Sequence, residues 1–112
     1  SQDQIDAAYA KAFRAPCLMI AVISSLPSEP AVPLNERLIS LGCAMQNMLL
    51  MAETLAIGSG ITSGQAMNSQ SIRDLFFFTE HEEGICFINF GTVSSRKPAR
   101  PRAPPSSFVS TL

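Results

Sequence analysis

Few side chains in this sequence could carry out chemistry unaided. His81 is the only histidine, and it lies among Glu80, Glu82 and Glu83. A zinc site would need further nitrogen or thiolate ligands at suitable spacing, so this run of charges is expected to be a solvated turn. No serine lies in a GxSxG elbow, and His81 would be the only base for a Ser-His-Asp triad. The residues therefore predict neither a metal centre nor a hydrolase site.

The cysteines and the glycine cluster do not supply a reactive group either. Cys17, Cys43 and Cys86 are widely spaced and form no CxxC pair, which is typical neither of a disulfide framework nor of a zinc site. We expect them to be small apolar side chains in a reducing, cytoplasmic setting. Residues 58–64 lack the GxxxxGK spacing of a phosphate-binding loop and follow a helical pattern rather than a strand. If the protein is an enzyme, a cofactor must carry the reaction.

Length and composition describe one small domain with a single core. The chain has 112 residues, a formal charge of −1, 46% hydrophobic residues and 15% charged residues. These values exclude a disordered chain and a polybasic nucleic-acid binder. Residues 1–16 contain no apolar signal region, and the longest nearly apolar stretch, 38–52, is shorter than the roughly 20 residues of a membrane span. We expect neither a nucleic-acid partner nor a membrane partner.

Proline positions divide the chain into an ordered interval and two flanks. All eight prolines lie outside residues 34–97, so regular structure should concentrate there. A short helix is predicted within residues 1–13, ending before Pro16. The apolar run 17–24 predicts a strand that is buried on both faces, and residues 25–33 predict a surface loop.

The most hydrophobic segment predicts a long helix from about residue 35 to residue 57. Asn35 can cap its start, and Gly58 can take the left-handed position after its end. Apolar side chains surround most of its circumference, so this helix is expected to be buried centrally. Three further elements are predicted: a short strand at 58–62, a helix that starts at Asn68 or Ser69, and a second buried strand at 84–90.

The last residues differ in composition from the rest. Half of the basic residues lie there, and no acidic residue follows Glu83, so the first 83 residues sum to −5 and the remainder to +4. Four prolines between 98 and 105 predict an extended arm with apolar anchors at Phe108, Val109 and Leu112. Arginines of this arm could hold a cofactor phosphate. Composition alone favours a solvated basic tail. The basic residues concerned are Arg96, Lys97, Arg100 and Arg102.

The order of these elements and five segments resemble the C-terminal part of the FMN-dependent nitroreductase family, closest to its small single-domain branch. Each segment is a soft match alone, but their order and spacing make the resemblance specific across residues 5–112. The segments are KAFRAPCLMIAVI at 11–23, LISLGCAMQNMLLMAETLAIGSG at 38–60, ITSGQAMNSQSIRDLF at 61–76, GICFINFGT at 84–92 and PRAPPSSFVSTL at 101–112.

The resemblance implies an α+β sandwich, an antiparallel sheet with helices on both faces that here lacks the family's N-terminal helices. Residues 1–93 would be the C-terminal portion of the domain, and 94–112 the extended, basic, proline-rich arm. It also implies a homodimer with FMN at each interface and NAD(P)H as co-substrate. Such an enzyme reduces nitroaromatic or quinone-type acceptors by ping-pong hydride transfer. The alternative is a non-catalytic dimerisation or binding fragment that has lost flavin binding.

The family's functional positions transfer to this sequence in three places, and no catalytic side chain is among them. A W-[RT]-[ST]-G segment that touches the flavin is matched by Ile61, Thr62, Ser63 and Gly64, with isoleucine in place of tryptophan. The stretch associated with the nicotinamide nucleotide is matched by Met51, Ala52, Glu53, Thr54, Leu55 and Ala56. Arm positions that are often basic and near phosphate are matched by Arg100 and Arg102.

One family motif has no counterpart in the sequence. The family begins with an Arg-Ser helix that grips the FMN phosphate, and this chain starts where a family domain is about two-fifths complete. Each charge-assisted hydrogen bond lost with that helix contributes roughly 1.5 to 3 kcal/mol. We therefore expect FMN binding by this chain alone to be weak or absent.

Overall fold

The computed structural model describes residues 1–3, 6, 10, 13–27 and 31–112. The helix predicted within residues 1–13 lies largely outside this part of the chain. The elements, in chain order, are β1 (Cys17–Ser24), α2 (Leu34–Thr54), β2 (Gly58–Thr62), the 3₁₀ helix η1 (Gln65–Asn68), α3 (Gln70–Leu75), β3 (Glu82–Gly91) and the 3₁₀ turn η2 (Pro105–Ser107). The predicted α+β class and the predicted positions of all three strands are confirmed.

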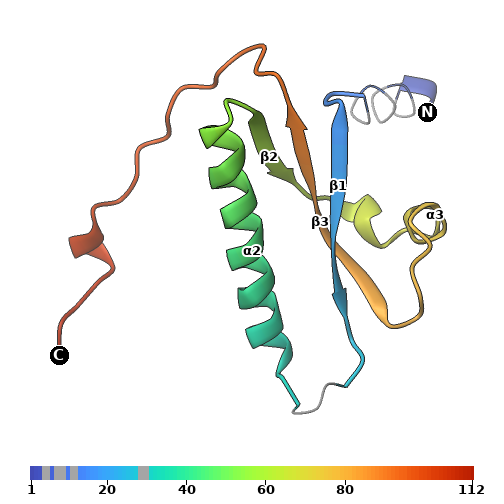
Figure 1. Ribbon diagram of the computed structural model, residues 1–112, viewed down its shortest axis with the longest axis horizontal. Coiled ribbons are helices and arrows are strands. Elements are labelled where there is room, and N and C mark those ends of the chain that lie inside the picture. The colour runs from blue at the N-terminus through green and yellow to red at the C-terminus, as the bar shows by residue number, and fades with distance from the viewer. Residues whose placement is uncertain (4–5, 7–9, 11–12, 28–30) are drawn as a thin grey trace.

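The strands form one antiparallel sheet with β3 in the centre, in the order β1-β3-β2. Helix α2 lies along one side of this sheet, and α3 with the segment leading into it lies on the other (Figure 1). The paired residues Ala21 and Cys86 face α2, because the Cys86 sulfur lies 3.4 Å from the Met45 sulfur. Their neighbours point to the opposite face, since side chains alternate along a strand.

The core is thin and lies mainly between α2 and the sheet. Its buried apolar side chains are Ala21, Ile23, Ala52, Met67, Cys86 and Ile88. The expectation that β1 is buried on both faces is wrong, because its first three residues are exposed. In β3, burial alternates instead through Gly84, Cys86 and Ile88. Cys86 and Ile88 are buried on the face toward α2. A β-bulge, where Ala21 pairs with Cys86 and Val22 with Gly84, puts Gly84 on the opposite face, beside Met67 and Phe78.

Helix α2 differs from its predicted boundaries and burial. It begins at Leu34 and ends at Thr54. Pro33 is the N-cap residue and no side chain caps the helix, so the prediction of Asn35 as the N-cap is wrong. The expectation that α2 is buried centrally is also wrong for this chain, because Ala52 is the only buried residue of the helix. Ile39 and Leu50 are 65% and 58% exposed. The sheet covers one side of α2, and nothing within the described residues covers the other.

Helices α2 and α3 each end in a Schellman motif with a non-glycine residue in the left-handed region. After α2, Ala56 has φ 56°, and the Ile57 N–H donates to the Ala52 carbonyl at 2.8 Å. After α3, Phe77 has φ 55°, and the Phe78 N–H donates to the Arg73 carbonyl at 2.8 Å. The prediction that Gly58 takes the left-handed position after α2 is therefore wrong, because Ala56, two residues earlier, takes it.

Gly58 is needed for close packing instead. A Cβ atom there would lie 2.5 Å from Val93 Cγ2 and 2.8 Å from the Gly91 carbonyl oxygen, closer than real contacts allow. The glycine lets the first residue of β2 lie against the end of β3.

Arg37 holds the connection between β1 and α2. Its Nε donates to the Val32 carbonyl, and its Nη1 donates to the carbonyls of Ser24 and Leu26, all at 2.8 Å. Charge-assisted bonds of this kind are stronger than neutral ones. One guanidinium thus fixes both ends of the turn to the start of α2.

The arm makes no regular structure apart from η2, and residues 94–112 are exposed throughout. It leads away from the sheet past α2, and the two termini lie on opposite sides of the molecule (Figure 1). The expected anchors Phe108 and Val109 are 70% and 59% exposed, so they do not anchor the arm on this chain. No helix in the described part of the chain is long and apolar enough to cross a membrane.

Substitution of Ala56 by glycine should stabilise the fold. A left-handed conformation is unfavourable for an L-residue with a Cβ, so Ala56→Gly should raise the free energy of unfolding by about 1 kcal/mol. The matched control Ala44→Gly, at an exposed position inside α2, should lower it by about 1 kcal/mol. Urea denaturation at equal protein concentration measures both. Shifts of the same sign would contradict this account of the helix end.

Loss of the Arg37 guanidinium should release the β1–α2 connection. Arg37→Met keeps the aliphatic stem and removes the donors, and we expect the free energy of unfolding to fall by about 1 to 3 kcal/mol. The control Arg96→Met lies in the exposed arm and should change the free energy of unfolding by less than about 0.5 kcal/mol. Equal effects in the two variants would show that the clamp contributes nothing specific.

Candidate functional site

Two cavities border the sheet in the described part of the chain, and the larger of these two lies on the face opposite α2. Its volume is about 540 Å³, within the range of small-molecule sites. Apolar side chains form most of its wall, together with a few polar groups. The apolar lining residues are Leu18, Ala66, Met67, Ile72, Leu75, Phe76 and Phe87; the others are Arg14, Thr62, Ser63, Gly64, Gln65 and Asn89.

The segment η1–α3 forms one wall because local capping and one buried anchor hold it. Met67 is only 4% exposed and fixes η1 against the sheet. The side chain of Ser69 caps α3 by accepting a hydrogen bond from the Ile72 N–H at 3.3 Å. The prediction of a helix starting near Ser69 is confirmed. Ile72 on the first turn of α3 then lines the cavity.

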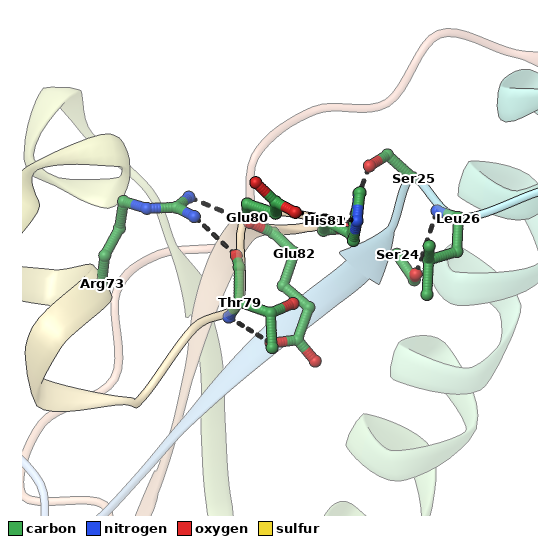
Figure 2. A network of polar contacts seen from close by, with 8 residues as sticks. All are labelled: Ser24, Ser25, Leu26, Arg73, Thr79, Glu80, His81 and Glu82. Atoms are coloured by element: carbon green, nitrogen blue, oxygen red, sulfur yellow. Dashed lines mark hydrogen bonds and ion pairs between the residues drawn. The ribbon is translucent and has the colours of Figure 1, made fainter.

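Arg73 ties the far end of α3 to the start of β3. Its guanidinium donates to the carbonyls of Thr79 and Glu82 at 2.6 and 2.9 Å, as Figure 2 shows. It also lies 5.9 Å from the ring centroid of Phe78. The Glu82 carboxylate accepts a hydrogen bond from the Thr79 N–H at 2.8 Å. Because neighbouring residues of α3 line the cavity, this network fixes the position of that wall.

His81 lies in the same turn and faces solvent. Its Nε2 is 3.3 Å from a Glu80 carboxylate oxygen, and the two side chains are 45% and 85% exposed. Its carbonyl accepts hydrogen bonds from the backbone and hydroxyl of Ser25, which join the turn to the end of β1 (Figure 2). The predicted solvated turn is confirmed. Among the described residues, no three His, Cys, Asp or Glu side chains gather as metal ligands.

A polar edge runs along the cavity where β2 pairs with β3. The Asn89 side chain donates from Nδ2 to the Thr62 hydroxyl at 3.1 Å and to the Gly60 carbonyl at 3.4 Å. Gly60 is the direct pairing partner of Asn89 in the sheet. Asn89 and Arg14 also line a smaller, shallower cavity of about 330 Å³ beside the start of β2. The two residues therefore stand at the junction of both cavities.

Among the described residues that line the larger cavity, Arg14 carries the only ionisable side chain. The buried thiol of Cys86 points toward Met45 on the other face of the sheet. Burial raises the pKa of Cys86 and keeps it protonated, so it offers no thiolate to the cavity. Cys17 and Cys43 are exposed, which differs from the apolar role expected for them.

The structure brings together some of the predicted site residues and separates the others. Thr62, Ser63 and Gly64 line the larger cavity, whereas Ile61 does not. Residues 51–54 form the end of α2 and residues 55–56 follow it, and none of them lines either cavity. Arg100 and Arg102 lie in the exposed arm and line neither cavity.

Sequence reasoning missed Arg14 and Asn89. One signal for Asn89 exists, because it is the only polar side chain within the apolar run of residues 85–90. A lone polar residue in an otherwise apolar strand needs a hydrogen-bonding partner or a ligand. Arg14 carries no comparable signal, because its place at the cavity depends on how the chain enters β1.

Comparison with known proteins adds an independent line of support for the fold. The model of the nitroreductase family matches residues 3–92. The chain is 31% identical over 106 residues to "Putative NAD(P)H nitroreductase YdjA" of Escherichia coli (strain K12), a match that covers 94% of this chain and 57% of that protein. The chain thus spans little more than half the length of this relative.

Solved structures agree with the chain in fold. A nitroreductase-like family protein from Bacillus cereus superposes with a TM-score of 0.82 at 14% identity, over 100% of this chain and 60% of that one. A mutant of the FMN- and NADPH-dependent nitroreductase NfnB from Sphigopyxis sp. strain HMH superposes with a TM-score of 0.74 at 17% identity. This match covers 97% of this chain and 49% of that one. Because the family model covers most of the sequence and these structures share its architecture, this chain belongs to the nitroreductase family.

Proposed function

We propose that the chain forms the flavin-facing part of an FMN-dependent NAD(P)H oxidoreductase of nitroreductase type, acting on nitroaromatic or quinone-type acceptors. One observation carries the proposal. Thr62, Ser63 and Gly64 match the family segment that touches the flavin, and they line a largely apolar cavity of about 540 Å³. The FMN and NADPH dependence of NfnB is consistent with this cofactor choice.

The lining residues fit a flat aromatic cofactor better than they fit unaided catalysis. Phe76 and Phe87 offer apolar surface, and the extended backbone at Gly64 leaves open space where a side chain would project. When bound, FMN supplies hydride transfer between NAD(P)H and an electron-poor acceptor. The guanidinium of Arg14 favours negative charge at its end of the cavity.

The other transferred positions enter the proposal through a second copy of the chain. We assign residues 51–56 to the nicotinamide nucleotide, and Arg100 and Arg102 to a phosphate, as the family positions suggest. Neither group lines the cavity of its own chain. An interface between two chains would let both groups approach a cofactor.

The exposed surface supports a homodimer. The chain exposes 9281 Å², against about 6,000 Å² for a folded monomer of its mass. Its radius of gyration is 17.3 Å, against about 13 Å for a compact domain of this length. Ile39 and Leu50 lie on the side of α2 away from the sheet. We propose that a second copy covers this side, with residues 94–112 as the arm between the two.

We also propose a cytoplasmic location. The three cysteines, Cys17, Cys43 and Cys86, are free thiols. Free thiols are typical of reducing compartments.

Filling the cavity should block flavin binding. Gly64 has extended backbone geometry, and a Cβ there meets no atom within 4 Å, so Gly64→Leu should fold while its side chain occupies the cavity. We expect FMN affinity, measured by flavin fluorescence, to fall at least about tenfold, which is a loss of about 1.4 kcal/mol. Ser71→Leu adds the same side chain at an exposed position of α3 outside the cavity and should leave affinity unchanged.

Two results of this titration would contradict the proposal. Equal FMN affinity in wild type and Gly64→Leu would show that the flavin does not bind in this cavity. A colourless wild-type chain that takes up no FMN would favour the alternative, a dimerisation or binding fragment without flavin.

A charge on the outer side of α2 should prevent dimerisation. Light scattering should give the wild type twice its 12.0 kDa chain mass and Leu50→Glu the mass of one chain, because a buried unpaired carboxylate is costly. The control Phe77→Glu alters an exposed apolar residue that follows α3 on the other face of the sheet and lines neither cavity. It should remain dimeric. A monomeric wild type, or a dimeric Leu50→Glu, would contradict the assignment of this interface.

A further inference from the structure

The polar edge of the larger cavity has a fixed hydrogen-bond polarity. The Gly60 carbonyl can only accept, so the Asn89 atom 3.4 Å away must be the amide nitrogen. The same nitrogen lies 3.1 Å from the Thr62 hydroxyl oxygen. An amide nitrogen carries two hydrogens, and these two contacts use both. Thr62 is therefore the acceptor of this bond, and its own hydroxyl hydrogen is left to donate elsewhere.

Two groups at this edge remain available to a ligand. One is the Thr62 hydroxyl hydrogen, on an exposed residue. The other is Asn89 Oδ1, to which no group in the described part of the chain donates a hydrogen bond. Both residues line the cavity. A donor and an acceptor thus lie side by side on a wall that is otherwise mainly apolar.

We propose that Asn89 is a positioning and specificity residue that makes this wall selective for a ring lactam or imide edge. In such an edge a carbonyl oxygen lies beside a ring N–H. Thr62 would donate to the carbonyl oxygen, and Asn89 Oδ1 would accept from the N–H. The proposal rests on the proposed function, and it assigns the imide end of a flavin ring to this wall.

A purely structural role for Asn89 predicts different behaviour. In that case its bonds to Thr62 and Gly60 would only join β2 to β3, and the cavity would not distinguish a ring N–H from its N-methyl derivative. Selectivity requires that the Asn89 carbonyl itself accept from the ligand. The Thr62 hydroxyl acts on the neighbouring carbonyl and is indifferent to the methyl group.

The test compares riboflavin with 3-methylriboflavin, whose imide nitrogen carries no hydrogen, by fluorescence titration of the 112-residue chain. The wild type should bind riboflavin about tenfold more tightly, the effect of one hydrogen bond. Asn89→Leu, an apolar residue of similar size in an apolar strand, should bring this ratio close to one. Thr62→Val should weaken binding of both ligands about tenfold and keep the ratio, and Thr62→Ser should resemble the wild type.

Each outcome decides the matter. Equal binding of the two flavins by the wild type, or an unchanged ratio in Asn89→Leu, would overturn this inference and leave the proposed function standing. Binding of neither flavin, even at the high ligand concentrations at which weak binding is measured, would overturn the proposed function and this inference with it. Thr62 is exposed, so Thr62→Val should fold even if Asn89→Leu does not. Unchanged affinity in Thr62→Val would also overturn the assignment.

Discussion

The structure depends on the central strand β3, which pairs with β1 over residues 82–90 and with β2 over residues 87–91. Alternate side chains of this one strand serve two different purposes. Cys86 and Ile88 pack under α2 and build the small core. Phe87 and Asn89 face the other way and form the wall of the cavity. A one-residue slip in pairing would exchange these faces, putting a carboxamide in the core. Strand register therefore determines stability and site chemistry together.

Local patterns in the sequence were sufficient for most elements. The apolar runs located β1 and β3, and Ser69 marked the start of α3 through its capping side chain. The helix ends were predicted less well. Rules of propensity favour glycine in the left-handed position, yet Ala56 and Phe77 occupy it. In both places the Schellman hydrogen bonds and the onward path of the chain impose a conformation that the residue type disfavours. Such tertiary demands cannot be seen in a local pattern.

Burial and the candidate site needed more than local pattern. The apolar content of α2 showed that this helix must be covered, but not that this chain covers only one side of it. Thr62 and Gly64 were identified through their match to a family segment, and the structure places them at a cavity. Asn89 and Arg14 reach that cavity only through strand pairing and through the entry of the chain into β1. Those are long-range relations, which residue spacing does not encode.

The central claim is that a flavin binds between the β2–β3 edge and α3. Amide hydrogen exchange of the 112-residue chain, with and without FMN, tests this claim most directly. Protection is expected in residues 62–67 and in the segment 87–89, which contribute lining residues to the cavity. Protection confined to other segments, with these two unchanged, would place the flavin elsewhere and contradict the claim.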